Sequence, residues 1–543
     1  MSVIIYILIA LYILVAAGMI LCSKNLVHIL QLEGYKNKNY FKWLKKNFLK
    51  VYTLPIIVAF LFILAKFILN LIFAGSAGWL GGISVVIIAI YGMLILVYNK
   101  KSSINHAKKP LIYTGRVKRL FVFISAFYLA LTAGLFLLDG IVLKYTAFAG
   151  ILIFTELIFI GAGVLVANII VMPIESMVKK WYFNDAKKKL AIRNDLIKIG
   201  ITGSYGKTSC KYILGTILSE KYNVLVPPSS YNTPMGLTRV IREQMQAAHE
   251  VFIAEMGARH KGDIKELCEL VYPTYGVITS VGPQHLETFK NIENIAQTKF
   301  ELIESLPENG CAFFAADNEI CRSLYNRTKI EKQLFGTDYD GKVDMRARNI
   351  TTGPFGSRFD LVLDEETISC ETKLLGRHNI ANITGCAAVA KKLGLTAKQI
   401  RLGIRKIEPV EHRLQIMPRA GSVTVIDDAF NSNPSGVKAA MEVLLGFEGR
   451  KIVVTPGMVE LGEQEEKENY EFGRIMAVVA DVVYLIGPRH TKPVYDGLVQ
   501  NGFDPKNITI TKTLDEATKS LWAKVRLGDV ILFENDLPDN YNE

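Results

Sequence analysis

The chain has 543 residues, of which half are hydrophobic and 21% are charged. This length exceeds that of a single domain of about 100–200 residues, and the composition predicts membrane segments joined to a soluble part. The net charge of +12 is concentrated at one end, because residues 1–199 hold 23 of the 63 basic residues but 6 of the 51 acidic ones. A nucleic-acid-binding protein usually carries such charge on its folded reading domain. Here the charge flanks apolar runs, which is typical of membrane topology.

Five apolar stretches in the first third are long enough to cross a bilayer, which takes about 20 residues. The first lacks the basic start of a signal peptide and four more follow it, so we expect it to be a retained helix. Lys66 and Glu156 lie inside the stretches and are functional candidates, although an ion pair or a lysine reaching the interface is the more ordinary explanation. The five predicted spans are 3–22, 51–74, 78–98, 119–138 and 146–172.

The basic residues predict how these spans are oriented. Loops 23–50 and 99–118 are rich in lysine and arginine, whereas the other two loops contain one basic residue, Lys144. Because basic loops stay in the cytoplasm, we expect the N-terminus outside and everything after residue 172 inside. Residues 175–195 are expected to form a basic juxtamembrane linker on anionic lipid head groups. The seven scattered cysteines form no CxxC pair, which argues against a zinc or redox site and suits a reducing cytoplasm.

From residue 196 onward, short β-rich runs alternate with helical stretches. Residues 196–202 predict a buried strand, which leads into a loop with two glycines and then a helix to about residue 220. Such a loop forms a cradle in which backbone N–H groups face phosphates. Lys207 is then placed to neutralise β and γ phosphate oxygens, and the Thr208 hydroxyl to bind Mg²⁺. The loop departs from the GxxxxGK[ST] pattern, because Ile201 stands where the first glycine would be.

Two further predicted strands lead to residues that could bind a metal ion or take part in catalysis. The strand 251–254 ends at Glu255, and a carboxylate at that end of a parallel strand beside a phosphate loop can hold the same Mg²⁺. The strand 275–280 is followed by His285, and Lys299 lies in the next helical stretch. Taken singly, each of these three side chains has a more ordinary explanation.

Together these residues resemble the Mur ligase family. The phosphate loop, Glu255, His285 and Lys299 occur in the family's order, and the similarity covers about residues 196–535. It is greatest to the members that add D-alanyl-D-alanine to a muramyl tripeptide. Four further segments match: 230–234 (Ser-Tyr-Asn-Thr-Pro), 375–382 (Leu-Gly-Arg-His-Asn-Ile-Ala-Asn), 427–434 (Asp-Asp-Ala-Phe-Asn-Ser-Asn-Pro) and 455–462 (Thr-Pro-Gly-Met-Val-Glu-Leu-Gly).

The resemblance implies a multidomain fold. An α-helical transmembrane bundle (1–174) and the basic linker would precede an α/β central P-loop domain of the Mur ligase type (196–408). A C-terminal Rossmann-like α/β domain (409–543) would follow, with a hinge near 406–410. In the family these two α/β domains close over the nucleotide and exclude water.

The resemblance also implies a role for each matching residue. Lys207, His285 and Lys299 would be catalytic. Thr208 and Glu255 would hold one magnesium ion and His285 a second, near Lys299, which is carbamylated in many family members. The nucleotide would be bound by the phosphate loop and by the C-terminal side of the site: Gly203, Ser204, Gly206, Lys207, Thr208, Ser209, Asn318, Asn382, Arg413, Asp428 and Asn431.

The implied activity is that of an ATP-dependent ligase with ATP and Mg²⁺ as cofactors. A substrate carboxylate would be activated as an acyl phosphate, and an amine would then displace phosphate to form an amide. The implied partners are a muramyl-peptide or related acceptor, an amino acid or a dipeptide such as D-alanyl-D-alanine, and membrane lipid, without nucleic acid. The implied location is the cell membrane, with the ligase domains in the cytoplasm.

Two features depart from the family pattern. Muramyl ligases carry an N-terminal domain that binds the UDP part of the precursor, and no such soluble domain precedes residue 196. The last strand is followed by Glu534-Asn535-Asp536, where the D-alanyl-D-alanine-adding members have a basic residue, then glycine and serine. Two alternatives therefore stay open: a ligase for a lipid-linked or polyglutamate-type acceptor, and a non-catalytic membrane scaffold. A transporter would need a second nucleotide-site signature, which we do not find.

Overall fold

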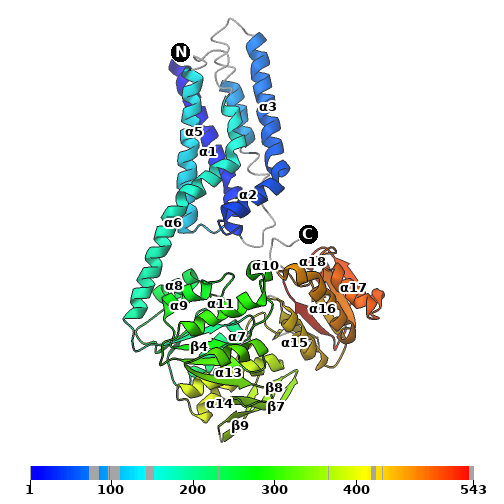
Figure 1. Ribbon diagram of the computed structural model, residues 1–543. Coiled ribbons are helices and arrows are strands. Elements are labelled where there is room, and N and C mark those ends of the chain that lie inside the picture. Colours follow the sequence, from blue (N-terminus) through cyan, green and yellow to red (C-terminus); the bar gives the residue numbers. More distant parts are fainter. Residues whose placement is uncertain are drawn as a thin grey trace. The chain divides into compact units, whose positions relative to one another are not determined.

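The computed structural model describes residues 2–72, 85–95, 97, 110–141, 152–229, 231–364, 366–417, 423–430 and 432–536. The chain divides into two units, Met1–Trp181 and Tyr182–Glu543 (Figure 1).

Among the described residues, four helices that lie in or begin in the first unit are long and apolar enough to cross a membrane. The described part of the predicted span 78–98 is the helix Val85–Ile95, which is shorter than a span, and the rest of that prediction lies outside the described residues. Lys66 is buried in the bundle, whereas the side chain of Glu156 lies outside the described residues. The helices are α1 (Ser2–Leu32), α2 (Asn37–Lys46), α3 (Phe48–Ile72), α5 (Gly115–Ile141), the 3₁₀ helix Leu152–Phe159 and α6 (Ile160–Ala191).

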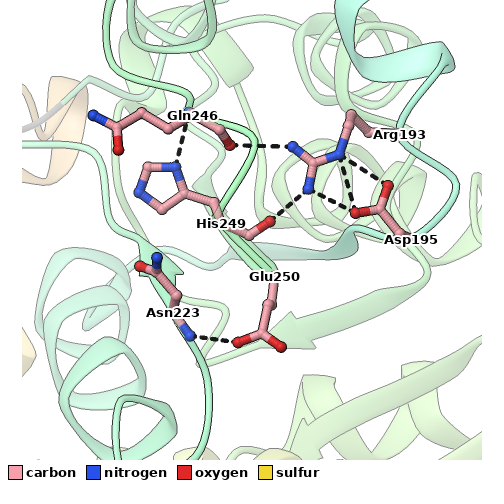
Figure 2. Close-up of polar contacts among 6 residues, drawn as sticks. All are labelled: Arg193, Asp195, Asn223, Gln246, His249 and Glu250. Carbon is pink, nitrogen blue, oxygen red and sulfur yellow. Dashed lines mark hydrogen bonds and ion pairs between the residues drawn. The ribbon is translucent and has the colours of Figure 1, made fainter.

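Helix α6 continues through Pro173 to Ala191, so most of the predicted linker is helical. Its last turns belong to the second unit, where Asp185 accepts a hydrogen bond from Arg242 at 2.7 Å. Figure 2 shows the connection from this helix to the next strand. Arg193 pairs with Asp195 and donates to the main-chain oxygens of Gln246 and His249 at 3.1 and 2.6 Å. This guanidinium therefore fastens the incoming chain to the loop that precedes β3 (Val251–Glu255).

The second unit begins with a nine-stranded sheet in the order β2-β3-β1-β4-β5-β6-β7-β8-β9. Strands β1 to β6 are parallel to their neighbours, and β7, β8 and β9 extend the sheet as an antiparallel meander. The strands are β1 (Ile197–Thr202), β2 (Val224–Leu225), β3, β4 (Tyr275–Ile278), β5 (Cys311–Ala315), β6 (Glu331–Gly336), β7 (Met345–Gly353), β8 (Gly356–Leu363) and β9 (Glu366–Thr372).

Hydrophobic residues on both faces of this sheet explain why helices cover it on both sides. Successive strand residues point to opposite faces: Ile253 packs in the cluster with α7, α13 and α14, whereas Phe252 and Ala254 pack in the cluster with α8, α9, α11 and α12. The helices are α7 (Lys207–Leu218), α8 (Pro234–Glu243), α9 (Asp263–Val271), α10 (Leu286–Phe289), α11 (Ile292–Glu304), α12 (Glu319–Arg327), α13 (Arg377–Lys392) and α14 (Ala397–Arg405).

A second sheet, in the order β10-β11-β15-β12-β13-β14, forms the C-terminal domain. It is parallel except for β10, and helices again cover both faces. The elements are β10 (Gln415–Met417), β11 (Thr424–Asp428), α15 (Pro434–Leu445), β12 (Lys451–Thr455), α16 (Glu465–Val479), β13 (Val482–Ile486), α17 (Lys492–Gln500), β14 (Ile508–Thr511), α18 (Leu514–Trp522) and β15 (Val530–Glu534), with 3₁₀ turns at Gly462–Gln464 and Pro505–Asn507. The predicted fold class, apolar helices followed by two α/β domains, is confirmed.

Candidate active site

The phosphate loop joins β1, in the middle of the nine-stranded sheet, to the N-terminus of α7. Gly206 has φ +79°, and a Cβ there would lie 2.8 Å from Oδ1 of Asn382. A Cβ on Gly203 would lie 2.1 Å from the hydroxyl of Thr279. Both positions therefore exclude larger residues, since Gly206 also needs a left-handed backbone. Ser204 Oγ donates to Gly282 O at 2.9 Å and ties the loop to the segment after β4.

Lys207 curls over this loop, and its Nζ donates to the main-chain oxygens of Gly203 and Ser204 at 2.7 and 3.2 Å. Burial lowers the pKa of Lys207 to about 8, although the carboxylate of Glu255 opposes the shift. A bound phosphate would favour the charged amine for the same electrostatic reason.

Glu255 lies at the end of β3, beside the start of α7. Its Oε1 accepts hydrogen bonds from Thr208 Oγ1 and Asn232 Nδ2, each at 3.0 Å. Its Oε2 lies 3.3 Å from Nζ of the fully buried Lys211. Lys211 was not predicted from the sequence, although its position one helical turn after Lys207 places both amines on one face of α7.

The pair Thr208–Glu255 fits a magnesium ion that arrives with a nucleotide. Magnesium prefers oxygen ligands and usually takes only one or two carboxylates, completed by phosphate oxygens and water. Glu255 Oε2 is buried beside the Lys211 amine at 3.3 Å, and such an ion would share this carboxylate oxygen with that ion pair. Across the part of the chain that the structure describes, no group of three ionisable ligands forms a self-sufficient metal site.

His285 lines the same cavity of about 440 Å³ as Lys207, Thr208 and Glu255. Its Nδ1 lies 2.7 Å from Oε2 of Glu460, which follows β12 in the C-terminal domain. The structure thus brings together four predicted residues, and it adds Glu460, which the sequence placed only inside a matching motif.

Lys299 is buried on α11 and does not line the cavity. Burial lowers its pKa well below the usual range, and the positive charge of Lys207 adds to this shift. This shift favours the neutral amine, which is the form that reacts with carbon dioxide.

Some of the other residues predicted to bind the nucleotide line the cavity and some do not. Arg413 lines the cavity with its guanidinium 4.4 Å from the ring centre of Phe430. Asp428 does not line the cavity. Its Oδ1 accepts a hydrogen bond from the Leu414 N–H at 3.1 Å, and burial raises the pKa of Asp428 to about 6. Ser209 is buried and does not line the cavity.

Asn318 also lies away from the cavity lining. Its side chain caps α12 by accepting from the Cys321 N–H at 3.0 Å and donates to Val281 O at 2.9 Å. Its adenine contact stays a prediction, and Asn431 lies outside the described residues.

Comparisons with known proteins identify the family of both α/β domains. The model of the Mur ligase middle domain matches residues 201–390, and that of the Mur ligase glutamate ligase domain matches residues 412–534. The UDP-N-acetylmuramoyl-tripeptide–D-alanyl-D-alanine ligase of Mycobacterium tuberculosis is 31% identical over 364 residues, which are 63% of this chain and 70% of the relative. The enzyme of that name from Escherichia coli is 29% identical over 316 residues, or 58% and 70%.

Two solved structures show the same arrangement of α/β domains. MurF from Acinetobacter baumannii has a TM-score of 0.60 at 25% identity and covers 66% of this chain and 77% of its own. MurF from Thermotoga maritima, solved in complex with ADP, has a TM-score of 0.59 at 27% identity and covers 66% and 80%. With both domain matches in order around a nucleotide-type loop, the chain belongs to the Mur ligase family and is an ATP-dependent amide ligase that forms ADP and phosphate.

Proposed function

We propose that this chain is a membrane-anchored ligase that joins D-alanyl-D-alanine, or a similar amino acid or dipeptide, to the carboxylate of a muramyl-peptide acceptor in the cytoplasm. The observation that carries the proposal is the shared cavity of Lys207, Thr208, Glu255 and His285. It is supported by the activity for which relatives are named, and this chain matches those relatives over 70% of their length. The four apolar helices support the membrane anchor.

The first step activates the acceptor. A carboxylate oxygen attacks the γ-phosphorus of ATP, and the bond from that phosphorus to the β–γ bridging oxygen breaks, which yields an acyl phosphate and ADP. Lys207 would leave the main-chain oxygens of the loop and offset charge on the phosphate oxygens. Magnesium held by Thr208 and Glu255, with a second ion at His285, would supply further positive charge there.

The second step forms the amide. The amine attacks the acyl carbon, the resulting tetrahedral intermediate expels phosphate, and the nitrogen loses a proton. Arg413 reaches the cavity from the start of the C-terminal domain and would bind the nucleotide. Closure around the cavity would exclude water, which otherwise hydrolyses the acyl phosphate.

We further propose that Lys299 carries a carbamate. Its neutral amine would form a bond to the carbon of carbon dioxide and lose a proton, which gives an anion beside the cationic Lys207. The unmodified alternative, a lysine that contacts phosphate, requires a charged amine, and the lowered pKa of Lys299 opposes it.

A second candidate is a ligase of the same chemistry for a lipid-linked acceptor. The described part of the first third of this chain holds four helices apolar enough to cross a membrane, where muramyl ligases carry their UDP-binding domain. The acidic Glu534-Asn535-Asp536 segment also departs from the D-alanyl-D-alanine-adding members.

The test uses full-length protein in detergent with ATP, Mg²⁺, UDP-muramyl tripeptide and D-alanyl-D-alanine, and it follows phosphate release and product mass. We expect ligated product from the native protein, none from Lys207→Ala and a large loss with Lys299→Arg, which cannot carry the carbamate. ATP turnover that requires Lys207 but gives no product would favour the lipid-linked acceptor. Product formation by Lys207→Ala would contradict the proposed role of the phosphate loop.

A further inference from the structure

A histidine–carboxylate pair joins the two α/β domains at the cavity. His285 precedes α10 in the middle domain, and Glu460 lies between β12 and α16 in the C-terminal domain. Their Nδ1 and Oε2 atoms are 2.7 Å apart, and the side chains are 17% and 25% exposed. Arg259 Nη2 lies 3.6 Å from the other carboxylate oxygen and faces it from the middle domain.

Both partners have an unusual backbone. His285 has φ +53° and Glu460 has φ +64°, in the left-handed region that residues other than glycine rarely occupy. Strained residues persist where surrounding structure holds them, and they gather at functional sites. Two of them in one contact indicate that the placement of these side chains matters.

The pair fixes which ring nitrogen of His285 carries the proton. An ionised carboxylate can only accept a hydrogen bond, so Nδ1 must donate to Glu460. In the neutral ring, the lone pair of Nε2 is then available to a ligand. Histidines that bind metals almost always donate their other N–H to a carboxylate, a carbonyl or water, which fixes the ring and raises its basicity.

We propose that Glu460 is a positioning residue that orients the His285 ring for metal binding. This orientation requires the C-terminal domain, which carries Glu460, to be in place. The inference rests on the proposed role of His285 as a ligand of the second magnesium ion. In this arrangement the middle domain supplies the ligand, and the C-terminal domain supplies the carboxylate that orients it. Domain closure and completion of the second metal site are then one event.

The test measures metal binding rather than ligation. Full-length protein in detergent is saturated with the non-hydrolysable ATP analogue AMP-PNP and titrated with Mn²⁺, with free Mn²⁺ measured by electron paramagnetic resonance. His285→Ala identifies the binding class that depends on the histidine. We expect Glu460→Ala to weaken that class by about 10–100-fold. Glu460→Gln should weaken it less, because its amide oxygen can still accept from Nδ1.

The control and the double variant separate this role from general damage. Glu463 is an exposed neighbour that forms no ion pair within the described residues, and Glu463→Gln should leave Mn²⁺ binding unchanged. If Glu460 acts through the histidine, His285→Ala/Glu460→Ala should bind no more weakly than His285→Ala alone. Thermal unfolding checks that each variant is folded, and the isosteric Glu460→Gln remains informative if Glu460→Ala is not.

Three outcomes would overturn the inference: unchanged or tighter Mn²⁺ binding in both Glu460 variants, additive losses in the double variant, or no His285-dependent class in the native protein. Tighter binding would mean that Glu460 blocks the histidine instead of orienting it. The measurement needs no acceptor or amine. A wrong choice of substrate in the ligation assay therefore leaves this result intact, and failure here leaves the ligation assay as the test of the proposed function.

Discussion

Gly206 illustrates how one residue sets the shape of the phosphate loop. Its left-handed backbone and the 2.8 Å approach of a Cβ to Asn382 both oppose a side chain. We expect Gly206→Ala to weaken ADP binding at least tenfold, since the backbone cost alone is about 1–2 kcal/mol, with isothermal titration calorimetry as the measurement. Gly353→Ala is the matched control, because a Cβ there meets no atom within 4 Å. Equal ADP affinity in the two variants would contradict this account.

The buried carboxyl groups of Asp428 and Glu534 make stability depend on pH. They are register partners at the ends of β11 and β15. Burial, and then the neighbouring charge of Asp428, raises the pKa of Glu534 well above its usual value. The folded protein therefore keeps a proton on this carboxyl to a higher pH than the unfolded chain does. Stability is full below the unfolded pKa of about 4.3 and is lost as the pH rises through the folded pKa.

Glu534→Gln should remove much of this dependence. The amide resembles the protonated acid, and its oxygen can still accept the Ser432 hydroxyl that lies 2.6 Å from Glu534. We expect the variant to unfold at a higher temperature than the native protein at pH 8, because the amide does not pay the cost of keeping a proton that the unfolded chain loses. The difference should shrink at pH 5. Thermal unfolding of detergent-solubilised protein at both pH values provides the measurement, and parallel shifts at the two would refute the assignment.

At the scale of elements, the residues around the phosphate loop show what a sequence can predict. The apolar run 196–202 and the glycines that follow determine β1 and the loop locally, and the strand ending at Glu255 was placed correctly for the same reason. The Lys211–Glu255 ion pair and the His285–Glu460 contact depend on which strands and domains become neighbours. A single sequence carries no local signal for such contacts.

The linker prediction left the conformation of residues 175–195 open, and the structure shows a helix there as far as Ala191. The lysines at 187–189 give the segment its basic character, and Ala186 and Leu190 pack into the core of the second unit and stabilise helix there. Tertiary packing of these apolar residues accounts for the helix, which the charge pattern does not specify.

The segment from α6 to β1 is held in place by the Arg193 guanidinium, whose hydrogen bonds are shown in Figure 2. Arg193→Ala would remove its bonds to Gln246 O and His249 O, and we expect faster proteinase K cleavage near residues 192–195, followed by mass spectrometry of the fragments. Arg239→Ala is the control, because Arg239 forms only an exposed pair with Glu243, and such pairs contribute little. Equal cleavage rates in the two variants would argue against this role of the Arg193 hydrogen bonds.

At the scale of the whole molecule, the apolar helices predict how the protein partitions. Their outward side chains include many exposed leucines, isoleucines and phenylalanines, which water would not tolerate over such an area. We expect the protein to stay in the membrane fraction after high-salt and carbonate washes and to be released by detergent. Protease added to inverted vesicles should digest residues 196–536. Release by salt alone would mean peripheral attachment.

The burial of the cysteines determines how the protein can be labelled at a thiol. All seven are buried and none forms a disulfide, and burial raises the pKa of Cys268, Cys311, Cys321 and Cys370 to about 12. Because the thiolate is the reactive form, maleimides should modify the folded protein very slowly. An exposed cysteine introduced by Glu463→Cys would then be the dominant labelling site in an otherwise unaltered chain. A fluorophore at that position could follow the approach of the C-terminal loop to the nucleotide in real time.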